Sequence, residues 1–246
     1  MSILMVLTSH DRLGDTGKPT GLWLEEFTTP YYIFRDEGVK VVLASPKGGK
    51  PPIDPRSEDP ELQTDSTRRF FKDKEALEAF EKTAQLSTLN PADYGAVFFP
   101  GGHGPLWDLA EDPHSIKIIE TFFAAGKPVG AVCHGPAVFR HTKGPNGTPL
   151  VQGKPVTGFS NSEEASIGAA EAVPFSVEDM LKENGADYSK AENWQPYVRI
   201  DGNLVTGQNP KSSEGVAWLF LDKLLNRETA REPGSGAGIS GGDAED

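Results

Sequence analysis

The chain has 246 residues, of which 37% are hydrophobic and 24% are charged, which is typical of a globular protein with one sizeable core. Its formal net charge of -12 argues against nucleic acid or an anionic membrane surface as a partner, because both attract clustered Lys and Arg. No apolar run approaches the roughly 20 residues that span a bilayer, and a single cysteine excludes an internal disulfide framework and a cysteine-based zinc cluster.

The first ten residues, MSILMVLTSH, lack a basic segment and lead directly into an apolar strand pattern. We therefore do not expect a secretory signal here. Together with the single cysteine, this favours the cytosol as the compartment.

Short apolar runs bounded by polar residues, glycine or proline predict strands that are buried on both faces. They are residues 2–7, 39–44, 96–99 and 128–132. Between them, apolar residues recur at helical spacing over residues 22–34, 77–80 and 116–123. This alternation predicts an α/β fold, with a mostly parallel sheet covered by helices on both faces.

The later elements include a hairpin. Residues 155–159 predict another strand, and residues 198–200 and 204–206, joined by an Asp-Gly-Asn turn, predict an antiparallel pair. Helices are predicted over residues 175–184 and 212–226, the second with Ser212 or Ser213 as its N-cap.

Two segments have irregular composition. Residues 46–63 are rich in Pro, Gly and acidic residues, which predicts an excursion over the surface. Residues 228–246 have the composition of a disordered, acidic, Gly-rich tail. We expect one α/β domain over residues 1–227, and we expect neither irregular segment to carry the chemistry.

Cys133 follows the strand pattern of residues 128–132 and precedes a helix-like stretch. A lone cysteine is most often a buried small apolar residue, but strand, sharp turn and helix together are the arrangement of a nucleophile elbow. The small residues that such a turn requires are present, as Gly130, Ala131 and Gly135. The N–H groups at a helix N-terminus would lower the pKa of the thiol and populate the thiolate near neutral pH.

A glycine-rich turn, PGGHGPLWDL, follows residues 96–99. It is either an ordinary loop or, beside Cys133 at the carboxyl end of the sheet, part of an oxyanion site. In that case the N–H of Gly102 or His103 would act with the N–H of His134, and glycines such as Gly101 would let the backbone approach a ligand. Phosphate binding fits less well, because the P-loop lysine and the Rossmann spacing are missing.

An acid or base is also needed, and two glutamate pairs are candidates. Glu25 and Glu26 lie in the first predicted helix, and Glu163 and Glu164 follow the strand predicted at residues 155–159. Such pairs are more often solvated than catalytic, and spacing alone does not resolve either pair.

Four motifs occur in the order of a known family. They are T-G-x-W-x-E-E, P-G-G-H-G-P-L-W-D, A-V-C-H-G-P and V-T-G-F-S-N-S-E-E. With them the chain resembles the ThiJ/PfpI superfamily, also called class I glutamine amidotransferase-like proteins. Within it, the chain looks most like the heat-shock chaperone-like branch that acts as glutathione-independent glyoxalases (glyoxalase III). The resemblance covers about residues 2–225 and implies a flavodoxin-like α/β sandwich.

The resemblance implies roles for single residues. Cys133 would be the nucleophile with His134 beside it, and Glu164 would orient that histidine. Glu26 matches a buried glutamate that hydrogen-bonds the cysteine sulfur, which makes Glu25 a bystander. An ionised carboxylate there would raise the pKa of the thiol, so we expect Glu26 to be protonated at rest.

The same resemblance assigns the glycine-rich turn. Gly102 and His134 would supply oxyanion N–H groups next to Gly101, and His103 would line the pocket. The implied substrate is a small α-oxoaldehyde, methylglyoxal or glyoxal, converted to its hydroxy acid through a hemithioacetal on Cys133 with no metal and no other cofactor.

Other functions remain open at this stage. A holdase chaperone or stress protein would keep its activity without Cys133, and a redox sensor would show selective oxidation of Cys133 by low peroxide. Proteolysis and amidotransfer rank lower, because no second domain is present to deliver ammonia. The resemblance also admits a homodimer.

Overall fold

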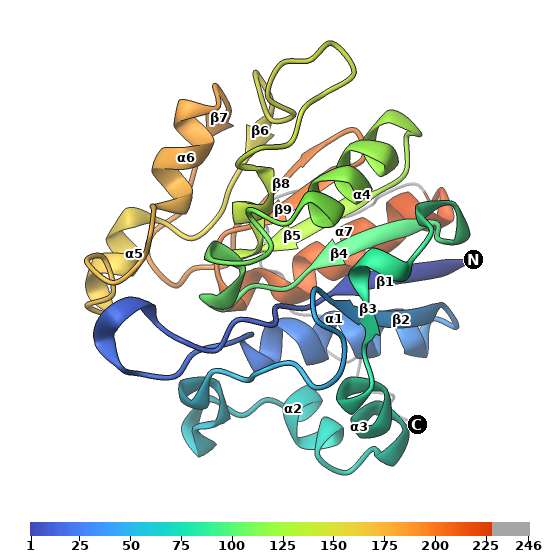
Figure 1. The fold of residues 1–246 in the computed structure, drawn as a ribbon, viewed down its shortest axis with the longest axis vertical. Coiled ribbons are helices and arrows are strands. Elements are labelled where there is room, and N and C mark those ends of the chain that lie inside the picture. The colour runs from blue at the N-terminus through green and yellow to red at the C-terminus, as the bar shows by residue number, and fades with distance from the viewer. Residues whose placement is uncertain (228–246) are drawn as a thin grey trace, which may run out of the picture.

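The computed structural model describes residues 1–227 and has at its centre a seven-stranded sheet, in the order β3-β2-β1-β4-β5-β9-β8 (Figure 1). The strands are β1 (Ser2–Val6), β2 (Lys40–Ser45), β3 (Ala84–Gln85), β4 (Ala96–Phe99), β5 (Val129–Val132), β8 (Val198–Asp201) and β9 (Leu204–Gly207). Neighbouring strands run parallel except β8 and β9, which form the antiparallel hairpin expected from the sequence.

Helices cover both faces of this sheet. Ile3 and Met5 of β1 pack into the core beneath α1 (Leu24–Asp36) and α7 (Ser213–Leu225). The intervening Leu4 and Val6 pack into the second core, beneath α4 (Pro113–Ala124). Side chains alternate between the two faces of a strand, so a continuous apolar run is what a doubly covered sheet requires. The flavodoxin-like α/β sandwich is confirmed.

The remaining elements lie around this sandwich (Figure 1). They are α2 (Asp65–Phe70), α3 (Lys74–Glu81), α5 (Asn161–Ser166), α6 (Val177–Glu183) and a separate two-stranded sheet of β6 (Pro155–Val156) and β7 (Asp187–Tyr188). Among the described helices, none is long and apolar enough to cross a membrane.

The strand predicted over residues 155–159 ends after two residues and does not join the main sheet. Beyond Val156 the backbone bonds elsewhere: the N–H of Thr157 donates to Oγ1 of Thr206 at 2.9 Å, and the N–H of Phe159 donates to the carbonyl of Cys133 at 2.8 Å. This segment therefore supports the turn at Cys133 rather than a strand ladder.

Ser212 is the N-cap residue of α7, one of the two positions predicted, but its hydroxyl makes no capping hydrogen bond to this helix. A short 3₁₀-helix, Pro210–Ser212, precedes α7. The Ser212 hydroxyl donates to Asn209, and the Ser213 hydroxyl bonds the carbonyl of Pro210 and a carboxyl oxygen of Glu25.

The excursion at residues 46–63 is more firmly attached than its composition predicts. It holds two 3₁₀-helices, Pro55–Glu58 and Pro60–Leu62. Ile53 pairs with Leu22 in an isolated parallel bridge, just before α1. Asp54 is completely buried, so the excursion enters the fold. The predicted tail at residues 228–246 lies outside the described residues.

Candidate active site

Cys133 lies directly after β5 in a left-handed backbone conformation, with φ of 61°. A non-glycine residue in this region is strained and is held there by its surroundings. The N–H of Cys133 donates to the carbonyl of Gly207 at 2.9 Å, and its carbonyl accepts from Phe159. The nucleophile elbow is confirmed, but the helix after it is a 3₁₀-helix of five residues, Gly135–Phe139.

Cys133, His134 and Glu164 form a connected series. Nδ1 of His134 lies 3.4 Å from Sγ of Cys133, and Nε2 of His134 lies 2.6 Å from Oε2 of Glu164. Burial alone would raise the pKa of Glu164, but its contacts with His134 and His103 hold the pKa well below its usual range. An ionised carboxylate only accepts, so Nε2 of His134 carries the hydrogen. In the neutral ring, Nδ1 is then free to accept a proton from the thiol.

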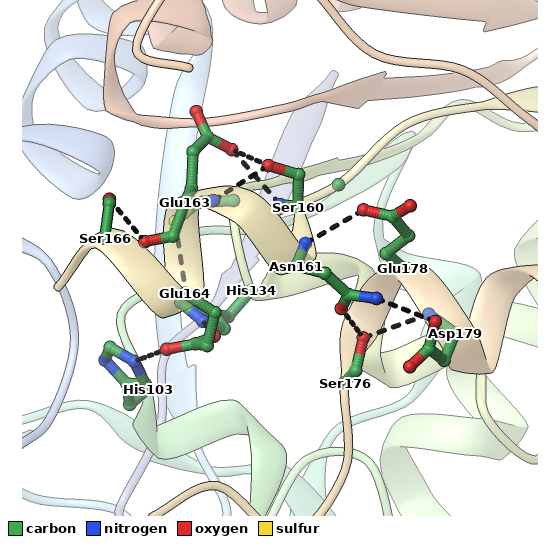
Figure 2. Close-up of polar contacts among 12 residues, drawn as sticks. His103, His134, Ser160, Asn161, Glu163, Glu164, Ser166, Ser176, Glu178 and Asp179 are labelled. Carbon is green, nitrogen blue, oxygen red and sulfur yellow. Dashed lines mark hydrogen bonds and ion pairs between the residues drawn. The ribbon is translucent and has the colours of Figure 1, made fainter. Parts of the chain in front are cut away.

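The structure separates the two glutamates that the sequence left unresolved. Glu163 and Glu164 leave the helix α5 in opposite directions (Figure 2). Glu163 forms a capping box with Ser160, whose N–H donates to Oε2 of Glu163 at 3.1 Å. Glu164 points to the histidines. The S-x-x-E spacing of a capping box was present in the sequence and would have assigned Glu163 to the helix end.

Glu26 is fully buried beside the elbow. Its Oε2 accepts from the N–H of Gly101 at 2.8 Å, and its carboxyl group also contacts the thiol of Cys133. Burial, and next the carboxyl group of Glu25, raise the pKa of Glu26 well above its ordinary value. A protonated Glu26 is therefore favoured, as expected from the sequence.

Burial raises the pKa of the Cys133 thiol well above its ordinary value, and an ionised Glu26 would raise it further. The sequence predicted a lowered pKa from a helix N-terminus. That prediction is wrong, because the five-residue 3₁₀-helix that follows supplies only a small dipole, whereas the sulfur is buried. Deprotonation of the thiol therefore depends on an adjacent base.

The glycine-rich turn packs tightly against the elbow. Gly102 has φ of 85°, and a Cβ on it would lie 2.4 Å from the carbonyl oxygen of Gly21. A Cβ on Gly101 would lie 2.8 Å from the backbone nitrogen of His134. Neither the N–H of Gly102 nor that of His134 donates to an acceptor in the described part of the chain. The oxyanion role that the sequence suggested for these two N–H groups stays a prediction.

His103 has a partner that the sequence did not indicate. Its Nε2 lies 2.8 Å from Oε1 of Glu164, and its Nδ1 lies 3.1 Å from a guanidinium nitrogen of Arg56 (Figure 2 shows the contact with Glu164). Arg56 belongs to the excursion at residues 46–63, so this segment contacts a candidate site residue, although the sequence analysis did not expect it to carry the chemistry. No local sequence signal marks Arg56, since only the fold brings it to the histidine.

The two histidines and Glu164 are the side chains best suited to hold a metal ion in the described residues, with their ligand atoms within 4.8 Å of one another. However, both Nε2 atoms are hydrogen-bonded to Glu164. Nδ1 of His103 faces Arg56, which can only donate. The ring hydrogen of His103 therefore lies on Nε2, the atom next to Glu164, which leaves this atom no lone pair for a metal ion. We assign the three side chains to a hydrogen-bond network.

Aromatic rings cover one side of this network. The rings of His103 and His134 lie 4.1 Å apart, and Phe159 lies 4.3 Å from the ring of His134 on centroid distance. Trp194 contacts Phe159 edge-on, with centroids 5.7 Å apart. Such packing restricts the orientation of the His134 ring.

Comparison with known proteins relates these residues to characterised chains. The profile described as the DJ-1/PfpI family matches residues 21–223. A glutathione-independent glyoxalase of Saccharomyces cerevisiae is 35% identical over 91% of this chain and 98% of that protein.

Solved structures are similar over the same extent. Rapid Encystment Protein 24 KDa of Francisella tularensis is 39% identical, with a TM-score of 0.87 over 91% of this chain and 99% of that one. Glyoxalase III of Candida albicans is 31% identical, with a TM-score of 0.85 over 91% of this chain and 97% of that one. The likeness thus extends over the segments that build the site.

Proposed function

The chain belongs to the DJ-1/PfpI family, and we propose that it is a glutathione-independent glyoxalase that converts methylglyoxal to lactate and glyoxal to glycolate. The observation that carries this proposal is the connected series of Cys133, His134 and Glu164 at the strained elbow. The glyoxalase names of the relatives from Saccharomyces cerevisiae and Candida albicans support it.

The first step is addition of the thiol to the aldehyde. Sγ of Cys133 forms a bond to the aldehyde carbon as Nδ1 of His134 accepts the thiol proton. The carbonyl oxygen becomes an oxyanion, which the N–H groups of Gly102 and His134 stabilise, and protonation of this oxygen gives a hemithioacetal. Glu164 stabilises the positive charge that develops on His134.

The second step moves a proton between two carbons. The group that gave its proton to the oxyanion, Glu26 or His134, is now unprotonated and acts as the base. It removes the proton from the carbon bonded to sulfur, and an enediol forms. The proton returns to the neighbouring carbon, which leaves a 2-hydroxyacyl thioester on Cys133. Water then cleaves the carbon–sulfur bond, releasing the hydroxy acid and restoring the thiol. The overall reaction adds one water to methylglyoxal, and the substrate is both oxidised and reduced internally.

The proposal also covers the domain, the compartment and the oligomeric state of the protein. Residues 1–227 act as one α/β domain, and the protein acts in the cytosol, which its single cysteine supports. The homodimer admitted by the resemblance stays a prediction, which sedimentation velocity would test.

The test is incubation of the purified protein with methylglyoxal, without glutathione or any other thiol, followed by measurement of lactate. Cys133→Ala is the matched variant, because it removes the only cysteine. Lactate from the wild type and none from the variant is expected. A wild type that forms no lactate, although it is folded by circular dichroism, would refute the proposal.

The same pair of proteins tests the rival functions. Suppression of aggregation of an unfolded client by both proteins would identify a holdase. The large apolar side chains exposed in residues 1–227 are Met1, Leu62, Phe71 and Ile167, the kind of side chain through which a holdase binds unfolded clients. Selective oxidation of Cys133 by low peroxide, without lactate formation, would identify a redox sensor.

A further inference from the structure

Glu164 is shared between two histidines. Its Oε2 accepts from His134 and its Oε1 accepts from His103, at 2.6 and 2.8 Å. The side chains of all three residues are at most 8% exposed, so water does not compensate for a lost partner. The two oxygens of Glu164 are therefore divided between His134, whose other nitrogen faces the Cys133 thiol, and His103, whose other nitrogen faces Arg56.

Whether His103 is charged determines how strongly Glu164 attracts His134. An uncharged His103 uses one N–H to hold Oε1 of Glu164. A doubly protonated His103 would form an ion pair with Glu164 and weaken the attraction of this carboxylate for His134. Burial, and next the neighbouring His134, lower the pKa of His103 to about 4.

Arg56 blocks the second proton at the atom where it would bind. A guanidinium nitrogen of Arg56 lies 3.1 Å from Nδ1 of His103. Because arginine only donates hydrogen bonds, Nδ1 must present its lone pair. The positive charge of Arg56 also opposes a second positive charge on the ring.

Arg56 is itself fixed. Two of its nitrogens donate to the carboxylate of Asp54, at 3.0 and 2.6 Å, and Thr20 donates to the same carboxylate at 2.8 Å. Asp54 is completely buried, whereas the Arg56 side chain is 42% exposed. A bidentate pair of this kind sets the plane of the guanidinium group, which explains why one N–H of Arg56 is aimed at His103.

We propose that Arg56 is a positioning residue of the active site, which adds to burial and to His134 in keeping His103 uncharged, so that Glu164 holds its full negative charge for His134. The charged and titratable groups that face His103 are Arg56, Glu164 and His134. Of these, only Arg56 meets Nδ1. The effect on turnover rests on the proposed function, but the effect on His103 does not.

The experiment measures the protonation of His103 directly. Long-range ¹H–¹⁵N spectra of protein labelled at histidine distinguish bare from protonated ring nitrogens, and His103→Gln assigns the signal among the five histidines. We expect a bare Nδ1 in the wild type from pH 5.5 to 8. In Arg56→Met we expect Nδ1 to gain a proton within this range, whereas Arg56→Lys, which retains a positively charged donor, keeps it bare.

Two rate measurements test how Arg56 affects the reactivity of the Cys133 thiol. In Arg56→Met, alkylation of Cys133 by iodoacetamide at pH 7 is expected to slow by about tenfold, with a similar fall in kcat for methylglyoxal and little change in KM. Arg68→Met is the matched control, since Arg68 pairs only with neighbouring residues on the surface. It should change neither rate.

The design guards against simple loss of folding. Arg56→Met leaves the buried Asp54 carboxylate without its pair, so the double variant Asp54→Asn, Arg56→Met is measured beside it and should behave alike. A bare Nδ1 of His103 in folded Arg56→Met, or unchanged alkylation, overturns this inference. Absence of lactate from the wild type overturns the proposed function instead, because neither the spectra nor the alkylation requires substrate.

Discussion

Nδ1 of His134 lies 3.4 Å from Sγ of Cys133, although the two residues are neighbours in the chain. Successive side chains of an extended strand point to opposite faces, and the φ of 61° at Cys133 removes this alternation. The strain at the elbow, on the order of 1–3 kcal/mol, thus brings a base to the nucleophile.

Alkylation of Cys133 by iodoacetamide should accelerate with pH well beyond neutrality. Burial raises the pKa of this thiol, so the thiolate fraction keeps growing as pH rises above 7. Alkylation of this thiolate adds to alkylation of the neutral thiol, whose proton His134 accepts. The measurement is the second-order rate constant from pH 6 to 10. A plateau reached below pH 7 would restore the lowered pKa that the sequence predicted.

Glu26→Gln should keep the fold and lose turnover. The amide is close in shape to a protonated carboxyl group and retains an acceptor for the N–H of Gly101, but it does not exchange protons. We expect kcat to fall by roughly 10²–10⁴, with Cys133 still alkylated. Glu25→Gln is the matched control on the same helix turn, and turnover of Glu26→Gln equal to that of this control would remove Glu26 from the mechanism.

Glu25 should make the protein less stable as pH rises from 4.5 to 7. Burial raises its pKa from 4.5 to about 7, so over this interval the folded state binds a proton that the unfolded state has released. Stability from this group is complete below 4.5 and is lost as pH rises through 7. Denaturant unfolding of wild type and Glu25→Gln should show a difference in stability that changes across the interval. A constant difference would contradict the raised pKa.

The adjacent glutamates of α5 should respond differently to the same substitution. Glu164→Gln places an amide N–H against the N–H of either His103 or His134. We expect kcat to fall by about 10²–10⁴, because the histidine loses the carboxylate that orients it. Glu163 instead accepts from the N–H of Trp194 and from Asn209. Glu163→Gln should mainly lower the melting temperature. The prediction fails if the two variants exchange these phenotypes.

Gly101→Ala should disturb the site, although Gly101 has no side chain that could take part in the reaction. The added Cβ would lie 2.5 Å from Oε2 of Glu26 and 2.7 Å from the carbonyl of Val132. We expect a stability loss of about 1–3 kcal/mol and a fall in kcat. Gly144→Ala is the control, because its nearest neighbour is a side-chain oxygen of Asn146 at 3.3 Å. Equal activity of the two variants would show that the turn tolerates the methyl group.

The sequence predicted those features that local pattern determines. Apolar runs predicted β1, β2, β4 and β5, but not the two-residue β3, and small residues flanking Cys133 predicted the elbow. The capping box of Glu163 is also a local signal, because Ser160 lies three residues before Glu163.

Other features depend on contacts between distant segments. The charged excursion has no apolar period, so its anchoring depends on Asp54, whose burial only the fold reveals. The pairing of Arg56 with His103 joins residues 47 positions apart. The raised pKa of Cys133 likewise follows from burial that neighbouring residues do not encode.

The groups around Cys133 come from segments between Glu26 and Glu164, and the carbonyl of Gly207 fixes its N–H. A nascent chain that has not yet produced Gly207 therefore lacks the pairing of β5 with β9 that holds the elbow. The thiol is then an ordinary accessible cysteine that reacts with aldehydes unselectively and without turnover. In refolding, lactate formation should accordingly begin no earlier than the pairing of β5 with β9, which makes catalysis a reporter of that contact.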